Sequence, residues 1–172
     1  NMMRLADFLF RQTADPTYMH YVEYNLQNGI FAQTYGPGNG LLTYFLPMKA
    51  GSRKSWAGEL DSFFCCHGTM VQANAALNRY MYYQDNKELY VTMYANSQAE
   101  FAVEDTKVTL NIQQDYMNGS LMSSSQNDAF QTVNDIAAAY ANKPDFKKYV
   151  ITVYADNESK FALNLRIPDW IM

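Results

Sequence analysis

Two adjacent cysteines, Cys65 and Cys66, are the only cysteines in this chain of 172 residues. They follow an extended aromatic run, Ser62–Phe64, and precede a segment with helical spacing of apolar residues. Neighbouring residues have Cα atoms about 3.8 Å apart, whereas disulfides prefer about 4.4–6.8 Å. A disulfide between the two would therefore be strained and easily reduced. A position before a helix N-terminus favours the thiolate form, so the pair is predicted to remain as thiols or to bind one soft metal ion. The alternative is a pair of small buried hydrophobic residues.

The composition of the chain excludes several classes of protein. The formal net charge is −4 and there is no basic run, which argues against a nucleic-acid partner. No apolar stretch approaches the roughly 18 residues that a membrane-spanning helix needs. Apolar and aromatic residues make up 48% and 15% of the chain, so a folded core is expected.

The first half of the chain shows the apolar spacing of helices. Residues 2–12 are predicted to form one helix, and Asp15 followed by Pro16 is typical of the start of a second. The second helix is expected to end near Asn28-Gly29 or one turn later, which makes an αα-hairpin. Its predicted apolar side consists of Tyr18, Tyr21, Val22 and Leu26.

The cysteine pair is expected to sit between a loop region and a third helix. Residues 35–40 are rich in glycine and predict a turn. Residues 41–46 form a short extended run closed by Pro47, and 49–61 have no clear period and are predicted to be a loop. The third helix is expected to begin after the cysteines and to end near Gln84–Asn86.

From Glu88 the apolar period changes from 3.6 to 2, which is typical of strands. In the last of them Phe161, Leu163, Leu165 and Ile167 alternate with more polar residues, so this strand is predicted to be half-buried. A hairpin turn at 156–159 is expected to join the last two strands. The polar stretch 123–128 is followed by a predicted helix near 133–140. The predicted strands are 89–94, 107–113, 149–154 and 161–167.

The fold class is therefore α+β, with a helical half (residues 1–86) followed by an antiparallel β half (residues 87–172). The chain has the character of a piece of a longer protein, because residues 2–10 already resemble the interior of a helix and the last residues stop just after a strand pattern.

Four segments together resemble one family, glycoside hydrolase family 127 and its close relatives, the retaining β-L-arabinofuranosidases. They occur in the family's order and cover essentially the whole chain. They are the helix end Glu23-Tyr24-Asn25-Leu26-Gln27-Asn28-Gly29, the segment Leu42-Thr43-Tyr44-Phe45-Leu46-Pro47-Met48, the pair with its aromatic residues Phe63-Phe64-Cys65-Cys66, and the strand Leu165-Arg166-Ile167-Pro168-Asp169-Trp170.

The resemblance implies a catalytic domain built as an (α/α)6 barrel, followed by β-sandwich domains. Residues 1–86 would be the C-terminal part of the barrel and residues 87–172 a segment of the sandwich. The implied substrates are terminal arabinofuranosides of plant oligosaccharides or glycoprotein glycans. Carried over, Cys65 is the nucleophile, and Cys65 and Cys66 bind a zinc ion. Zinc would hold the thiol deprotonated, and the thiolate is the nucleophilic form of cysteine.

Two further residues match the family's sugar pocket, Glu23 and Tyr44. The alternatives are a solvated helix carboxylate for Glu23 and simple packing for Tyr44. The other two zinc ligands and the general acid/base glutamate would belong to the remainder of the catalytic domain, expected upstream of Asn1. The isolated chain is therefore expected to have negligible activity.

Two other functions are compatible with the sequence. The β half could be a non-catalytic carbohydrate-binding or structural sandwich module, with the cysteines as core residues. A thiol-based redox or metal-sensing site has less support, because adjacent cysteines form a strained disulfide and there is no C-x-x-C motif.

Overall fold

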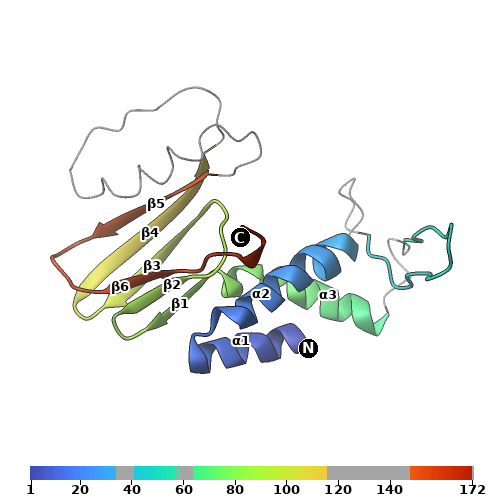
Figure 1. Ribbon diagram of the computed structural model, residues 1–172, viewed down its shortest axis with the longest axis horizontal. Helices are drawn as coiled ribbons and strands as arrows, with labels where there is room; N and C mark the ends of the chain where they lie inside the picture. The colour runs from blue at the N-terminus through green and yellow to red at the C-terminus, as the bar shows by residue number, and fades with distance from the viewer. Residues whose placement is uncertain (34–40, 57, 59–63, 116–147, 172) are drawn as a thin grey trace. The chain divides into compact units, whose positions relative to one another are not determined.

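The computed structural model describes residues 1–33, 41–56, 58, 64–115 and 148–171 (Figure 1). The chain forms two compact units. One unit comprises Asn1–Met93 together with Ala162–Met172, and the other comprises Tyr94–Phe161. The α+β class is confirmed. The division after residue 86 concerns the domains of a longer protein and stays a prediction.

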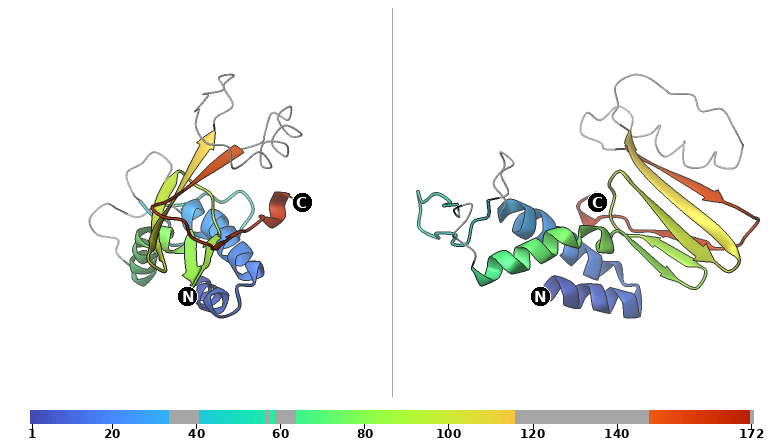
Figure 2. Two further views of the ribbon diagram at one scale, coloured as in Figure 1. Left: turned by 90° about the vertical axis from the view of Figure 1, so that its left-hand side faces the viewer. Right: turned by 180° about the vertical axis from the view of Figure 1, so that it is seen from behind.

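The first unit begins with the predicted helical hairpin, α1 (Met2–Thr13) and α2 (Pro16–Asn25). Ala14 ends α1 in the left-handed conformation, with φ of 54°. Asp15 then caps α2, because its carboxylate accepts a hydrogen bond of 2.9 Å from the Thr17 amide. The two helices lie side by side in Figure 1 and in the view from behind in Figure 2. Their contact buries a core of Ala6, Phe10, Met19, Val22, Leu26 and Tyr80.

The predicted apolar side of α2 was wrong at Tyr21, which is 42% exposed, whereas Met19 is fully buried. At 100° per residue, the buried stripe of Tyr18, Met19, Val22 and Leu26 places Tyr21 roughly 115° from its centre. The helix continues through a π-helical turn η1 (Leu26–Ile30) and a 3₁₀ turn η2 (Phe31–Gln33). The helix therefore ends one turn beyond Gly29, which was the later of the two predicted ends.

The third helix, α3 (Cys65–Ala75), begins at the cysteines themselves rather than after them, and it ends earlier than predicted. A 3₁₀ turn η3 (Leu77–Tyr80) follows, and then a strand β1 (Tyr82–Asp85) occupies residues that were expected to be helical. Asn86 has a φ of 49°, which permits the tight turn into β2 (Glu88–Val91). The hairpin is antiparallel, with Asp85 opposite Glu88.

The sheet of the first unit has the order β1-β2-β6, where β6 (Ala162–Leu165) runs parallel to β2. The predicted hairpin at 156–159 was wrong, because β5 (Lys148–Ala155) and β6 belong to different sheets. The prediction of a purely antiparallel β half was wrong, because β6 pairs with β2 in parallel. The apolar residues 161, 163, 165 and 167 were expected to form the buried face of the last strand. At the end of this segment the pattern of burial is reversed, because Leu165 and Ile167 are exposed and Arg166 is buried.

The second unit contains an antiparallel sheet of order β3-β4-β5. Its strands are β3 (Ser97–Val103), β4 (Thr106–Asp115) and β5 (Lys148–Ala155). The central strand β4 buries Val108, Leu110 and Ile112 at alternate positions. Strand β3 was not predicted; it turns into β4 at Glu104, whose φ is 53°. The turn predicted at 35–40, the polar stretch 123–128 and the helix predicted near 133–140 lie outside the described residues.

A buried carboxylate, Asp7 of α1, joins the helical hairpin to the sheet of the first unit. It accepts hydrogen bonds from Arg79 (2.6 Å), Tyr83 (2.7 Å) and Arg11 (3.2 Å). Burial, together with the bond to Asp7, raises the pKa of Tyr83, so the hydroxyl stays protonated and donates. The bond to Asp7 also raises the pKa of Arg79. The carboxylate thereby fixes α1 against η3 and β1.

Asp7→Asn is expected to lower the free energy of unfolding by about 2 kcal/mol, because it removes a buried charge with three donors around it. Urea denaturation of the whole chain measures the change. The matched control is Asp105→Asn in the exposed turn between β3 and β4, for which a change below about 0.5 kcal/mol is expected. Equal unfolding midpoints for the two variants would contradict the role given to Asp7.

Candidate functional site

The two cysteines lie at the first turn of α3, with both side chains exposed and both thiols free. Their Sγ atoms are 3.8 Å apart. The phenol oxygen of Tyr44 lies 3.6 Å from Cys65 Sγ. Three of the four residues singled out from the sequence therefore lie in one small cluster.

The segment that carries Tyr44 is anchored at Thr43, which is buried. The Thr43 amide donates to the carbonyl of Gln33 (3.0 Å), and its hydroxyl donates to the carbonyl of Ser55 (2.7 Å). These bonds hold an extended stretch that is a strand of neither described sheet. The position of Tyr44 is consequently set by the hydrogen bonds of the preceding residue, Thr43.

Aromatic side chains surround Tyr44. Its ring centroid lies 4.6 Å from that of Phe45, 4.8 Å from Phe64 and 5.7 Å from His67. His67 is buried, and its Nδ1 accepts a hydrogen bond of 3.3 Å from the Phe64 amide. His67 therefore helps to cap α3 just ahead of the thiols.

The electrostatics of the cluster favour a thiolate at Cys65. Hydrogen bonds from Tyr44 and Cys66, followed by the backbone amides at the helix start, lower the pKa of Cys65. The same contact with Cys65 raises the pKa of Tyr44 to about 12. Tyr44 therefore keeps its proton and can donate it to the Cys65 sulfur, which is the arrangement of a hydrogen-bonded nucleophile.

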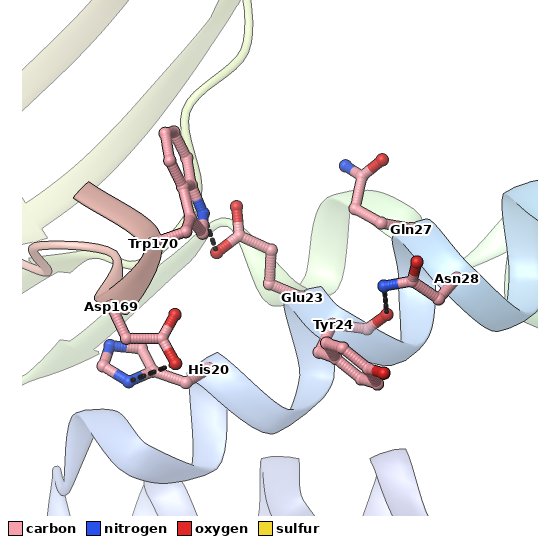
Figure 3. A pocket seen from close by; sticks show the side chains of 7 residues that line it. All are labelled: His20, Glu23, Tyr24, Gln27, Asn28, Asp169 and Trp170. Carbon is pink, nitrogen blue, oxygen red and sulfur yellow. Dashed lines mark hydrogen bonds and ion pairs between the residues drawn. The ribbon is translucent and has the colours of Figure 1, made fainter. Parts of the chain in front are cut away.

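Glu23 is not part of this cluster in the described contacts. Its Oε2 atom accepts hydrogen bonds from Arg166 (2.6 Å) and from the Trp170 indole (3.3 Å). Together with His20 and Asp169, Glu23 and Trp170 line a hollow beside α2 (Figure 3). The other lining residues are Tyr24, Gln27 and Asn28.

Arg166 is the residue at this second location that sequence reasoning did not single out. Its side chain is 2% exposed, and its Nε donates to the Thr92 carbonyl (2.5 Å) while a terminal nitrogen pairs with Glu23. The signal was present in the segment Leu165–Trp170, where an arginine stands among apolar residues of a strand.

The thiol pair could hold a soft metal ion. Two thiolates at about 2.3 Å from a tetrahedral zinc ion lie about 3.8 Å apart, which agrees with the observed distance between the sulfur atoms. In the part of the chain that the structure describes, no group of three or more His, Cys, Asp or Glu side chains is arranged to hold a metal. Cys65 and Cys66 would thus supply two ligands.

A known protein family matches the helical part of the chain. Residues 1–79 match the model of the β-L-arabinofuranosidase GH127 catalytic domain. This segment is similar to the catalytic domain of glycoside hydrolase family 127. It contains Glu23, Tyr44 and both cysteines, so the resemblance seen in the sequence is confirmed. Comparison with curated proteins finds no significant match.

Two solved structures share the fold. One is a GH127 β-L-arabinofuranosidase from Geobacillus stearothermophilus T6, with a TM-score of 0.67 and 19% identity over 98% of this chain. The other is a GH127 β-arabinofuranosidase, with a TM-score of 0.64 and 21% identity over 99% of this chain. This chain covers 24% and 22% of those two chains, so it spans about a quarter of their length. None of the helices in the described ranges is long and apolar enough to cross a bilayer.

Tyr44→Phe is expected to raise the pH at which Cys65 becomes reactive. The hydroxyl stabilises the thiolate, so its loss raises the pKa of Cys65, and alkylation at pH 7 slows. The rate of reaction with iodoacetamide is measured against pH in a Cys66→Ser chain with a chelator present. Tyr154→Phe, at an exposed position of the second unit, is the control. A midpoint that stays in place or falls in Tyr44→Phe would refute this assignment.

Glu23→Ala is expected to destabilise the chain by about 3 kcal/mol, because it leaves the buried Arg166 without its carboxylate. Denaturant unfolding measures the loss. Glu100→Ala is the control, since Glu100 pairs with Lys107 at 2.9 Å on an exposed surface and should cost at most about 1 kcal/mol. Equal losses in the two variants would mean that the buried pair does not anchor the fold.

Proposed function

We propose that this chain carries the nucleophile of a retaining β-L-arabinofuranosidase, with Cys65 as the attacking group. The observation that supports the proposal best is the contact between Tyr44 and Cys65 at the first turn of α3, inside the segment that matches the family. An exposed thiol with a lowered pKa beside a hydroxyl donor suits nucleophilic attack. The proposed substrates are terminal arabinofuranosides of plant glycans or glycoproteins.

The proposed reaction has two displacements. In the first, the Cys65 thiolate attacks the anomeric carbon, the bond from this carbon to the leaving oxygen breaks, and an acid protonates that oxygen. In the second, water attacks the same carbon, its proton passes to a base, and the carbon–sulfur bond breaks to return the thiolate. Most retaining glycosidases place a carboxylate where Cys65 stands here. The hydroxyl of Tyr44 would stabilise the sulfur each time it is anionic.

Cys65 and Cys66 would hold a zinc ion, and the distance between their sulfur atoms supports this part of the proposal. Bound zinc would supply a positive charge that keeps a coordinated thiol deprotonated near neutral pH. A zinc site takes four ligands as a rule. We therefore expect the remaining ligands and the general acid to come from outside the described residues, and the chain alone to be inactive.

The larger architecture belongs to the same proposal. Residues 1–86 would form the C-terminal part of an (α/α)6 barrel, and residues 87–172 would begin a β-sandwich. The roles of Tyr44 and Glu23 in binding substrate are also proposals. Tyr44 has the better support because it contacts Cys65, whereas the Oε2 atom of Glu23 is already engaged by Arg166 and Trp170.

The metal part is tested with Co²⁺ as a spectroscopic substitute for zinc. The chain is expected to develop thiolate-to-metal absorption during titration, and both Cys65→Ser and Cys66→Ser should reduce it strongly. His20→Ala removes an imidazole that lies outside the thiol cluster and should leave the absorption unchanged. Retention of the full signal in both serine variants would exclude the cysteines as ligands.

The catalytic part is tested in an enzyme that joins this sequence to the acid-supplying part of the catalytic domain. Cys65→Ser is expected to lower turnover of p-nitrophenyl β-L-arabinofuranoside by about a thousandfold or more, with the melting temperature nearly unchanged. Tyr154→Phe, a change of one oxygen atom at an exposed position of the second unit, serves as the control. If the Cys65→Ser enzyme keeps turnover within a factor of ten of the parent, the assignment of Cys65 as nucleophile is refuted. If the 172-residue chain alone turns over this substrate, the expectation that it is inactive is refuted.

A further inference from the structure

Two phenylalanine rings are exposed beside the thiol cluster. Phe45 is 70% exposed, and Phe64, the residue before α3, is 49% exposed. A single exposed apolar side chain is ordinary on a protein surface. These two rings differ because both contact the ring of Tyr44, with centroids 4.6 Å and 4.8 Å from it. Tyr44 in turn contacts Cys65. The two rings therefore lie within one tyrosine side chain of the Cys65 sulfur.

The residues around the two rings hold them in place. Phe45 meets Tyr44 edge to face, with an angle of 77° between the ring planes, which is a favoured arrangement of aromatic pairs. The Phe64 amide donates to Nδ1 of His67, and the two ring centroids lie 5.5 Å apart. His67 itself is buried. Because the rings are already ordered, a ligand that binds to them has little side-chain entropy to remove.

The chemistry of this surface selects among ligands. The segment that carries Phe45 also exposes Leu46 (48%) and Met48 (97%). The side chains of Phe45, Leu46 and Phe64 are hydrocarbon, so a ligand rich in hydroxyls would lose hydrogen bonds to water there without replacing them. An aromatic ring loses no such bonds and gains edge-to-face contacts. A flat apolar ring is therefore the ligand that suits the surface best.

We propose that Phe45 and Phe64 form a binding site for an aromatic ring attached to the molecule that reacts at Cys65. Neither residue belongs to the pair, Glu23 and Tyr44, that the motifs match to the sugar pocket. Under the proposed function, on which this assignment of the ligand rests, the ring belongs to the leaving group of the arabinofuranoside. The two phenylalanines thereby determine which leaving group is preferred, whereas Cys65 attacks the anomeric carbon of the sugar.

The ring site is tested without any glycoside by alkylation of Cys65. The Cys66→Ser chain, with a chelator present, is treated with N-benzyl iodoacetamide or with N-(2-methoxyethyl) iodoacetamide. In both reactions the Cys65 sulfur forms a bond to the methylene carbon and iodide leaves, so the reagents differ only in the appended group. The ratio of the two rates, divided by the same ratio for N-acetylcysteine, is expected to favour the benzyl reagent by about tenfold.

Variants of the two rings locate the origin of this preference. Phe45→Ala is expected to remove most of it, and so is Phe64→Leu, which keeps an apolar residue at the start of α3. Phe45→Tyr retains a ring and should retain the preference. Phe8→Ala, which removes a phenylalanine of α1 that is 56% exposed, is the matched control. Absence of a preference in the parent chain, or its survival in both Phe45→Ala and Phe64→Leu, would overturn the inference and leave Cys65 standing as the nucleophile.

The assignment of the ring to a leaving group is tested in the enzyme that joins this sequence to the acid-supplying part of the catalytic domain. Benzyl and 2-methoxyethyl β-L-arabinofuranosides are compared, because their leaving alcohols have similar acidity. The ratio of kcat/KM is expected to favour the benzyl glycoside and to fall about tenfold in Phe45→Ala. Tyr154→Ala, which removes an exposed ring of the second unit, should leave the ratio unchanged.

The outcomes in the joined enzyme separate this inference from the proposed function. If Phe45→Ala leaves the ratio unchanged although alkylation of the chain shows the ring preference, the inference is overturned, because the rings then pack against the rest of the catalytic domain. If the enzyme turns over neither glycoside, the proposed function fails together with the assignment to a leaving group. A benzyl preference in alkylation that Phe45→Ala removes would still support the ring site.

Discussion

The buried guanidinium of Arg166 is the interaction on which the first unit depends. It pairs with Glu23 of α2 and donates to the carbonyl of Thr92 just after β2, so one side chain joins a helix to the end of the sheet. A buried cation is tolerated only when it is paired and hydrogen-bonded. The hollow beside α2 follows from this, because the same carboxylate oxygen that pairs with Arg166 also holds Trp170.

Much of the fold followed from local signals. The Asp15-Pro16 helix start, the buried alternation of β4 and the start of α3 at the cysteines are all encoded by neighbouring residues. The partners of β6 were not predictable in this way. Its apolar alternation suggested a strand buried on one face, but parallel pairing with β2 and the engagement of Arg166 decide which residues are buried. Tertiary contacts override local periodicity there.

The residues of the candidate site likewise include some that local sequence predicts and others that only long-range contacts determine. The thiol pair could be predicted because two cysteines in sequence must be neighbours in space, and the family motifs added Tyr44, which contacts Cys65. Glu23 was matched by its motif as a pocket residue, but its bond to Arg166 joins positions 143 residues apart. No spacing rule within a single sequence reveals such a pair. The role of Trp170 as the wall of a hollow depends on it as well.

The parallel pairing of β2 with β6 has a consequence for the order in which the molecule can form. The segment that matches the family ends at residue 79, yet Arg166, which secures α2, follows the whole second unit in the sequence. During synthesis on a ribosome, α2 would emerge long before Arg166, the residue that pairs with its Glu23. Contacts between residues so far apart in the sequence slow folding, because a long loop must close to form them. Until β6 has emerged, the sheet of the first unit therefore lacks its last strand.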